Sequence, residues 1–492
     1  MLRNRKGSTL ILAYMVISVL ILLGAAFVVL SFNEGLFAER QRRSMVAFYI
    51  AEAGIERALY GLRRDFTTDS TGPSWSDGTI DTFTIGPDTS NYYTMPFAST
   101  SLNGGSYAVQ LKNITGKTNE IWIQSVGTYG DAKQTLLVYA KVKNLSVWNN
   151  AIFAGTGASG QMINGNVHIR GSVHILGDGL QPTDYVVDLG GTAELIGNNY
   201  NILDSGLKAK VPALPTTVFG GETVETLNAE LRVKHGIVGL SGASSAGEPN
   251  VTGNNTKETI DGSYVTNGFG GNQGSSSVYS DNGWSNGYDL GDTIEFPSLS
   301  DPYPGYATYQ EYLKANALVI DDAGQLAALA NITPTSNFSY SGPNGSISVN
   351  GSGAMTISGI VYVEGGGVKF SGAGINYSGQ GSILSTGNVN IESDLLTTGN
   401  ASFPTSVLGV MTPGTITFDT AQINVMGMFF GETSIVAKKQ TDVVGTFVSN
   451  YFDMGTNVPA IFQVPDAANN LPPGLIGATG GWSMDVVSWQ KI

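Results

Sequence analysis

Two histidines six residues apart are the first place in the sequence where metal chemistry is conceivable. His168 and His174 hold equivalent positions in a six-residue repeat, in which Asn166–Gly171 is followed by Ser172–Gly177. Histidines stacked on neighbouring strands can bind zinc. Alternation along each strand directs the flanking Val and Ile residues inward, so we expect both histidine rings to face solvent. The repeat contains no acidic residue, and no metal site is predicted.

A match to the nucleophile motif G-x-S-x-G occurs at Gly283–Gly287. In enzymes this motif requires a tight turn between a buried strand and a helix. Here polar residues precede it at Ser280–Asn282 and follow it at Tyr288 and Asp289. Chance matches are expected in a segment so rich in Gly and Ser, so no catalytic serine is predicted.

Acidic residues offer two other kinds of chemistry. Asp281, Asp289 and Asp292 lie among Asn and Gly and could supply oxygen ligands to calcium, although their spacing fits no standard loop and a solvated acidic loop is favoured. Glycan cleavage would need paired carboxylates on one face. Carboxylates are few and without obvious pairing in the later repeats: Glu364, Glu392, Asp394, Asp419, Glu432 and Asp442. The sequence therefore predicts no enzyme and no cofactor.

Aromatic residues are concentrated between residues 279 and 312. Exposed rings beside amides and carboxylates suit recognition of sugars or proteins. Tyr306 and Tyr309 are at helical spacing, which favours core contacts for them. Tyr279, Trp284 and Tyr288 remain as candidate ligand-binding residues.

The element that must carry the rest of the chain is a long N-terminal helix. No charged residue occurs from Thr9 to Phe32, and this apolar run reaches the roughly 20 residues needed to cross a bilayer. No proline precedes Pro73, so one continuous helix on the order of 80 Å long is predicted over residues 8–65. Its second half has one apolar stripe, formed by Phe48, Ala51, Ile55, Leu59 and Leu62.

A secretory signal peptide or a plain membrane anchor would also begin with an apolar run. The run is too long for a signal peptide, and no small-residue cleavage site follows it. The basic residues at positions 3, 5 and 6 place the leader in the cytoplasm, although Arg40, Arg42 and Arg43 on the other side weaken that asymmetry.

Taken together, these features resemble a type IV pilin-like protein. A short basic leader ends at Gly7, the apolar span follows at once, and Ala51–Gly54 reads Ala-Glu-Ala-Gly. The likeness is greatest to the PilX-type minor pilins and to the tip-forming pseudopilins of type II secretion. It implies cleavage by a prepilin peptidase between Gly7 and Ser8, and methylation of the new N-terminus.

Two positions depart from the pattern of that family. Ser8 stands where the first mature residue is usually Phe, and Leu12 stands where the fifth is usually Glu. In the family that Glu is thought to neutralise the amine of a neighbouring subunit, so Leu12 argues against a bulk fibre subunit. Tip-forming members also lack the Glu. The resemblance implies a fibre-packing helix that includes Leu12, Phe48, Glu52, Ile55 and Leu59.

The remaining chain is predicted to be mainly β. Alternation between Gly105 and Lys143 predicts three or four antiparallel strands in a small pilin-like domain, residues 66–147, covering Phe48, Ile55 and Leu59. The six-residue repeat and many later short Val/Ile runs predict a right-handed parallel β-helix over residues 148–492. An irregular insertion is expected at about 200–335, with helical pieces at 306–317 and 323–330, and a capping strand at 482–489. An antiparallel sandwich is the alternative.

Composition supports this division. The chain has 492 residues with 65 Gly and only 13% charged residues, which suits a turn-rich β protein. The net charge of −14 disfavours nucleic acid as a partner. Cysteine is absent, so disulfides and thiol catalysis are excluded.

The function expected is that of a minor pilin or pseudopilin in the assembly of a type IV pilus or related secretion fibre, at the tip or as a primer. Expected partners are other pilins, the prepilin peptidase, the bacterial inner membrane and a glycan or surface ligand of a periplasmic or extracellular head. The alternatives are a membrane-anchored protein that binds or degrades polysaccharide, and a cell-envelope scaffold.

Overall fold

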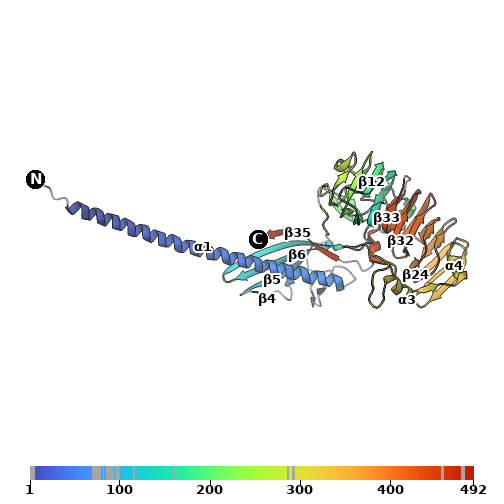
Figure 1. Cartoon of the computed structure of the whole chain (residues 1–492), viewed down its shortest axis with the longest axis horizontal. Coiled ribbons are helices and arrows are strands. Elements are labelled where there is room, and N and C mark those ends of the chain that lie inside the picture. The colour runs from blue at the N-terminus through green and yellow to red at the C-terminus, as the bar shows by residue number, and fades with distance from the viewer. Residues whose placement is uncertain are drawn as a thin grey trace. The chain divides into compact units, whose positions relative to one another are not determined.

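The chain folds into two compact units, one formed by Met1–Asn144 with Gly481–Ile492 and the other by Leu145–Gly480. The computed structural model describes residues 6–68, 79–80, 83–84, 93–94, 100–102, 104–114, 117–158, 162–284, 287–290, 294–455, 459–477 and 482–492. The predicted class, mainly β with a long N-terminal helix, is confirmed (Figure 1).

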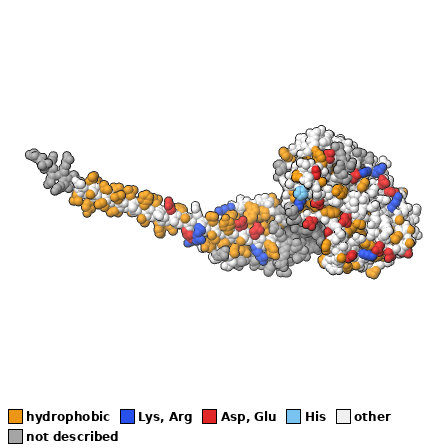
Figure 2. Space-filling model, in the orientation of Figure 1, with side chains coloured by type: hydrophobic (Ala, Val, Ile, Leu, Met, Phe, Trp, Pro, Cys, Tyr) orange, Lys and Arg blue, Asp and Glu red, His pale blue; other side chains and the backbone are white. Residues whose placement is uncertain are grey.

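The first unit begins with one uninterrupted helix, α1 (Lys6–Thr68). Its 63 residues correspond to about 95 Å of helix. Hydrophobic side chains cover much of the visible face of its N-terminal half in Figure 2. The second half is amphipathic, and its buried stripe runs from Ala47 through Ile55 to Leu62. The predicted continuity of the helix is therefore confirmed.

An antiparallel sheet packs on that stripe, as predicted. Its main strands are β5 (Gly105–Ile114), β6 (Lys117–Tyr129), β7 (Ala132–Asn144) and β35 (Trp482–Lys491). Two short strands pair with β5, namely β3 (Tyr93–Thr94) and β4 (Thr100–Leu102). A separate hairpin joins β1 (Thr79–Ile80) and β2 (Phe83–Thr84). Alternate residues of the sheet, such as Val109, Ile123 and Val138, form the core with α1.

The helix and the sheet approach most closely at two glycines. A Cβ added to Gly127 on β6 would lie 2.1 Å from the Ala47 carbonyl oxygen and 2.5 Å from the Ala51 nitrogen. A Cβ added to Gly54 on α1 would lie 2.3 Å from the Ser125 hydroxyl oxygen. Gly127 therefore allows the backbones of β6 and α1 to come into contact, and Gly54 leaves room for the Ser125 side chain.

The second unit is inserted between two neighbouring strands of the first. β7 ends at Asn144 and β35 begins at Trp482, and the two strands pair along their length. The sequence prediction assigned residues 482–489 to a cap on the second domain. Alternation in this segment matched a strand but could not reveal that its partner lies more than 330 residues earlier in the chain.

In the second unit, short strands from successive turns of chain pair in parallel. One ladder joins β21 (Leu318–Ile320), β24 (Ala354–Val363), β27 (Gln380–Ser385), β30 (Val407–Thr412), β32 (Ile423–Val436), β33 (Thr441–Asp453), β8 (Ile152–Ala158), β11 (Val173–Ile175), β16 (Glu230–Val233) and β19 (Gly262–Val265). The labelled strands β24, β32 and β33 follow one another along the stack in Figure 1.

Two further ladders run beside the first. The second joins β24, β26 (Ile375–Ser378), β29 (Leu395–Thr397), β32, β33, β34 (Ala460–Phe462), β10 (His168–Arg170), β13 (Glu194–Gly197) and β18 (Ser245–Ala246). The third joins β25 (Val368–Phe370), β28 (Val389–Ile391), β31 (Thr415–Phe418), β32, β33 and β8. A parallel four-stranded sheet contains β9 (Met162–Gly165), β12 (Tyr185–Gly191), β17 (Ile237–Leu240) and β20 (Phe269–Gly270).

Antiparallel pairing in the second unit is local. It joins β22 (Asn337–Gly342) and β23 (Gly345–Asn350) to β24, and β14 (Thr216–Phe219) to β15 (Glu222–Glu225). The helical pieces are α2 (Ser205–Lys208), η2 (Gly274–Ser277), α3 (Tyr309–Ala315), α4 (Ala323–Leu329) and η3 (Pro465–Asn469). α3 and α4 fall within the two helical stretches predicted near residues 306 and 323.

The six-residue repeat forms two short strands on different ladders, β10 and β11. Gly171 and Gly177 end the two repeats at φ values of +127° and +69°, which favour glycine. The structure differs from the predicted irregular insertion at 200–335, because β16, β18 and β19 continue the ladders through this region. Long Gly- and Asn-rich turns between strands of two to four residues concealed that regularity.

The order of the turns in space is not their order in the chain. β8, near the start of the unit, pairs with β33, near its end. On one side of β8 the stack continues through β11 and β16 to β19. On the other side β33 leads back through the later strands to β21. The chain therefore enters and leaves this unit in the middle of the stack.

One segment returns along the stack and connects its two ends. We call it the strap, residues 287–290 and 294–315. The Phe296 ring stacks with Phe153 at 6.4 Å and with Phe430 at 6.0 Å between ring centroids. Further along, the Gln310 amide donates a hydrogen bond of 2.9 Å to the Tyr362 hydroxyl. Phe296, which lies within the aromatic-rich stretch from 279 to 312, therefore fastens the strap to the ladders.

Candidate functional site

The N-terminal half of α1 is the largest exposed apolar surface among the described residues. α1 is also the one described helix that is long and apolar enough to cross a membrane, and none of its most apolar stretch is buried. Leu12, predicted as a packing residue, is 64% exposed. Gly7 and Ser8, the predicted cleavage site, lie in the first turns of α1, but their side chains are outside the described residues. This surface is available to lipid or to other helices.

The other predicted packing residues divide into two groups. Ile55 and Leu59 are buried under the sheet of the same unit. Phe48 and Glu52 are half-buried, and the Lys491 ammonium lies 5.8 Å from the centre of the Phe48 ring. A partner could therefore reach Leu12, Phe48 and Glu52, whereas Ile55 and Leu59 hold the sheet on the helix.

Charged residues form a collar between the exposed and covered halves of α1. Glu39 accepts hydrogen bonds from Arg42 at 2.8 Å and from Arg43 at 2.9 Å. These bonds lower the pKa of Glu39 to about 2. Arg43 also donates a 2.9 Å bond to Asp131, in the turn between β6 and β7. Arg42 and Arg43, two of the three arginines that weaken the positive-inside asymmetry across the membrane, are thus paired with nearby carboxylates.

The three candidate ligand-binding aromatics do not form one site. Trp284 is 52% exposed. Tyr279 is half-buried, and its backbone bonds to Ala246 and Ile260 continue the stack. Tyr288 lies in the strap, with its hydroxyl 2.6 Å from Nε2 of His174. Only Trp284 is presented to solvent as the sequence suggested.

The prediction that both histidines of the repeat face solvent is wrong for His174. This residue is 3% exposed and packs on Phe153 and Tyr288. Burial, helped by the nearby charges of Arg232 and Lys234, keeps its pKa well below the usual value. His174 does lie on the outer face of its strand, but the strap covers that face. Alternation alone could not reveal the strap.

His168 belongs to a buried charge cluster that the sequence did not reveal. Nδ1 of His168 lies 3.0 Å from Oε2 of Glu194, and the Arg170 guanidinium donates to the same oxygen at 2.7 Å. The Arg170 and Glu194 side chains are only 2% and 5% exposed. Glu248 approaches Arg170 at 3.4 Å. These acidic residues lie 24 and 78 positions from Arg170, so no local spacing indicates the cluster.

The two carboxylates of this cluster titrate in opposite directions. Burial, together with the hydrogen bond to Glu194, raises the pKa of Glu248 from 4.5 to about 7. Burial opposes the charge on Glu194, but bonds from His168 and the charge of Arg170 lower its pKa overall. Near neutral pH Glu248 is therefore partly protonated, whereas the lowered pKa of Glu194 favours its charged form.

The Glu248→Gln variant should remove a pH dependence of stability. A carboxyl group with a raised folded pKa stabilises fully below pH 4.5 and loses that contribution as pH rises through about 7. Allowing for solvent screening, the loss between pH 5 and 8 is about 1–2 kcal/mol. Gln keeps a hydrogen-bond donor but cannot ionise. Between pH 5 and 8 the variant should therefore gain this amount of stability relative to wild type, because only wild type loses the contribution.

Chemical denaturation at a series of pH values measures this difference. The opposite slope from buried His174 is present in both proteins and cancels. A difference that stays constant from pH 5 to 8 would contradict the account of Glu248.

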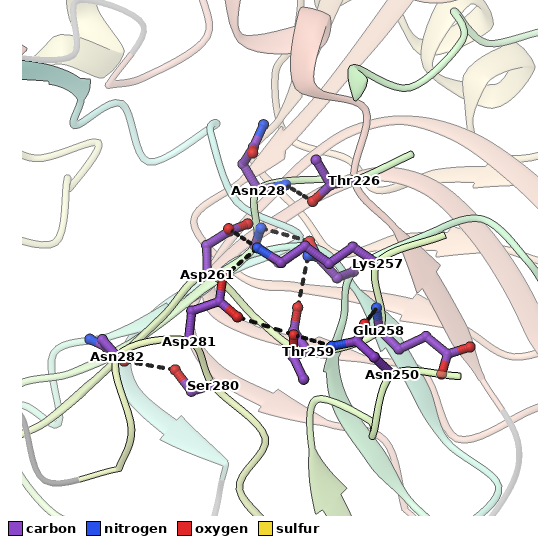
Figure 3. Close-up of polar contacts among 12 residues, drawn as sticks. Thr226, Asn228, Asn250, Lys257, Glu258, Thr259, Asp261, Ser280, Asp281 and Asn282 are labelled. Carbon is purple, nitrogen blue, oxygen red and sulfur yellow. Dashed lines mark hydrogen bonds and ion pairs between the residues drawn. The ribbon is translucent and has the colours of Figure 1, made fainter. Parts of the chain in front are cut away.

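The predicted acidic loop contains a second ion cluster, centred on Lys257 (Figure 3). The Lys257 ammonium contacts Asp261 and lies 2.6 Å from Oδ2 of Asp281. Thr259 donates to the other oxygen of Asp281 at 3.2 Å. Burial opposes the charge, yet the two carboxylates raise the pKa of Lys257. Asp281 is therefore part of an ion cluster instead of a freely solvated loop.

Several of the other predicted acidic residues are also paired. Asp289 lies 3.4 Å from Arg232, while Asp292 and the Ser285 of the nucleophile motif lie outside the described residues. Glu364 pairs with Lys314 and Glu392 with Lys369. Glu432 accepts a hydrogen bond from Ser298 of the strap. Among the described residues no group of three acidic, His or Cys side chains could hold a metal ion.

Comparison with known proteins finds a similar solved structure but no matching family. No known protein family and no characterised protein matches the sequence. The fold is similar to the crystal structure of the competence-associated pilin ComZ from Thermus thermophilus. The TM-score is 0.51 at 22% identity, and the match covers 92% of this chain and 97% of that chain. The exposed apolar helix is therefore carried by a chain whose fold is similar to that of a pilin.

Proposed function

We propose that this chain is a minor pilin-like subunit that assembles into a type IV pilus or a related secretion fibre, at its tip or as its primer. The observation that carries the proposal is the exposed apolar half of α1, continuous with a half that is buried under an antiparallel sheet. Apolar side chains around a helix of this length need lipid or other helices as neighbours. The fold likeness to ComZ supports the same role.

The assembly step follows from this surface. Before assembly the span lies in the bacterial inner membrane, with the head on the periplasmic side. A prepilin peptidase removes residues 1–7 and the amine of Ser8 is methylated. The helix then leaves lipid and packs beside helices of other pilins. Leu12 offers no carboxylate to a neighbouring amine, which suits a position at the end of a fibre.

The second unit is the exported head in this proposal. We propose that it is a right-handed parallel β-helix, in which each turn of chain contributes one strand to each face, and the three parallel ladders support this proposal. We propose that it is a rigid, non-catalytic module that presents a surface for adhesion. The pairing of Glu364 and Glu392 with lysines supports the absence of catalysis.

Purified filaments test the assembly role. The Leu20→Lys variant places a charge in the middle of the span, at about 2.5–3.5 kcal/mol against the membrane state. We expect at least a tenfold lower fraction of total chain in sheared filaments. Tyr60→Lys is the matched control, because Tyr60 is 57% exposed on the covered half of α1. Equal recovery of both variants, or absence of the wild-type chain from filaments, would refute the proposal.

A further inference from the structure

A shallow groove lies on the second unit where β8 and β33 adjoin β12. Its volume is about 700 Å³, within the range of small-molecule sites. The side chains that matter for its chemistry are those of Thr156, Leu180, Thr183, Asp184, Tyr185 and Tyr451. None of these takes part in the ion clusters or in the strap.

The Tyr185 ring packs over two glycines. A Cβ on Gly239 would lie 2.8 Å from Cε1 of the ring, and one on Gly270 would lie 3.2 Å from it. Neither glycine has a backbone conformation that requires glycine, since no positive φ occurs at either. The two glycines pair with each other on β17 and β20, so together they make room for the ring. Tyr185 nevertheless remains 45% exposed.

A second exposed ring belongs to the same groove. Tyr451 on β33 is 36% exposed, and its backbone pairs with Gly157 of β8. Both tyrosines therefore occupy fixed strand positions and keep part of the ring in contact with solvent. Large rings held in place in this way lose little freedom when they bind a ligand.

The polar groups of the groove are also held in place. The backbone N–H of Thr156 donates to the Asn450 side-chain oxygen at 3.1 Å, and its hydroxyl lies 3.2 Å from the Asp178 carbonyl. Oδ2 of Asp184 accepts a 2.8 Å hydrogen bond from the Gln181 backbone. The surface is therefore formed before any ligand arrives.

The chemistry of the lining selects the class of ligand. The lining side chains that the structure describes include a carboxylate and two threonine hydroxyls but no Lys or Arg, and the whole chain carries a net charge of −14. Phosphates and other anions are therefore disfavoured. Tyrosine faces suit the apolar C–H faces of sugar rings, while the carboxylate and hydroxyls suit sugar hydroxyls.

We propose that this groove binds a segment of a neutral polysaccharide, with Tyr185 and Tyr451 as the stacking residues. The proposal names a ligand for the adhesion surface proposed for the second unit and rests on that part of the proposed function, whereas the assembly role of α1 is tested separately in filaments. The groove contains none of the aromatic residues that the sequence suggested for ligand binding. Of those residues, Tyr288 is held by its contact with His174.

Calorimetric titration of the full chain in detergent tests the proposal. The probes are cellohexaose, chitohexaose and maltohexaose, with a thymidine hexanucleotide as a comparator that can stack but carries phosphates. We expect at least one hexasaccharide to bind more tightly than the nucleotide. Tyr185→Ala should weaken that binding at least tenfold, whereas Tyr185→Phe should retain it within about twofold.

Two further variants keep the test decisive. Tyr451→Ala, on a different strand, should also weaken binding and serves if Tyr185→Ala does not fold. Trp284→Ala removes a ring that is 52% exposed outside the groove and should change nothing. The proposal is overturned if no hexasaccharide binds, if the nucleotide binds better, or if loss of either tyrosine leaves affinity unchanged.

Discussion

Replacing Arg170 by methionine is expected to destabilise the second unit by about 3–5 kcal/mol, because the change leaves Glu194 charged and buried without its guanidinium partner. The two side chains are 2% and 5% exposed and lie 2.7 Å apart. Methionine fills much of the same volume, so the loss reports the charge and not a cavity. Chemical denaturation followed by circular dichroism would measure the change in free energy of unfolding.

Lys314→Met is the matched control for this prediction. It breaks the Lys314–Glu364 pair, whose side chains are 45% and 40% exposed. Exposed pairs of this kind contribute about 0–1 kcal/mol. If the two variants lost similar free energy of unfolding, burial would not explain the contribution of the Arg170–Glu194 pair to stability.

Gly127→Ala is expected to destabilise the first unit by about 2–3 kcal/mol. The added methyl group would lie 2.1 Å from the Ala47 carbonyl oxygen. That atom belongs to the backbone of α1, so the helix itself must move away from β6. Side-chain adjustment cannot relieve the contact. Thermal unfolding of the detergent-solubilised chain measures the loss.

The control for this substitution is Gly35→Ala on the exposed half of α1. A Cβ at Gly35 meets nothing within 4 Å. Alanine favours helix by up to about 1 kcal/mol over glycine, so this variant should be neutral or more stable. If Gly127→Ala proved as stable as Gly35→Ala, the helix would not pack on β6 as described.

The parts of the fold that follow from local patterns were predictable. An uncharged, proline-free run from Thr9 to Phe32 predicted a continuous helix, and alternation from Gly105 to Lys143 predicted antiparallel strands. Both are present in the structure. The six-residue repeat correctly indicated short strands with glycine corners, because its apolar positions and its glycines recur at one spacing.

Features that depend on distant segments were not predictable. The order of the turns, with β8 beside β33, depends on pairing across almost 300 residues. The burial of His174 depends on a strap that reaches it from residue 288. Strands as short as β18 contain too few residues to show a hydrophobic alternation in the sequence. In each case the local sequence was compatible with several partners.

The candidate site was predictable to a similar degree. Leu12 lies on the exposed apolar surface that the sequence indicated, whereas Ile55 and Leu59 face the sheet. The exposed Tyr185 ring was missed, although its signal was present. Gly239 and Gly270 stand within strands, where glycine often marks close approach of another group. That signal becomes specific only once the pairing of the two strands is known.

The mass of the mature chain tests the central claim most directly. Intact-mass measurement on protein purified from cells with an active prepilin peptidase should show loss of Met1–Gly7 and one added methyl group on Ser8. Protein from cells without the peptidase should keep all seven residues. A chain that keeps Met1–Gly7 in both kinds of cell would contradict the claim that α1 is the assembly helix of a pilin-like subunit.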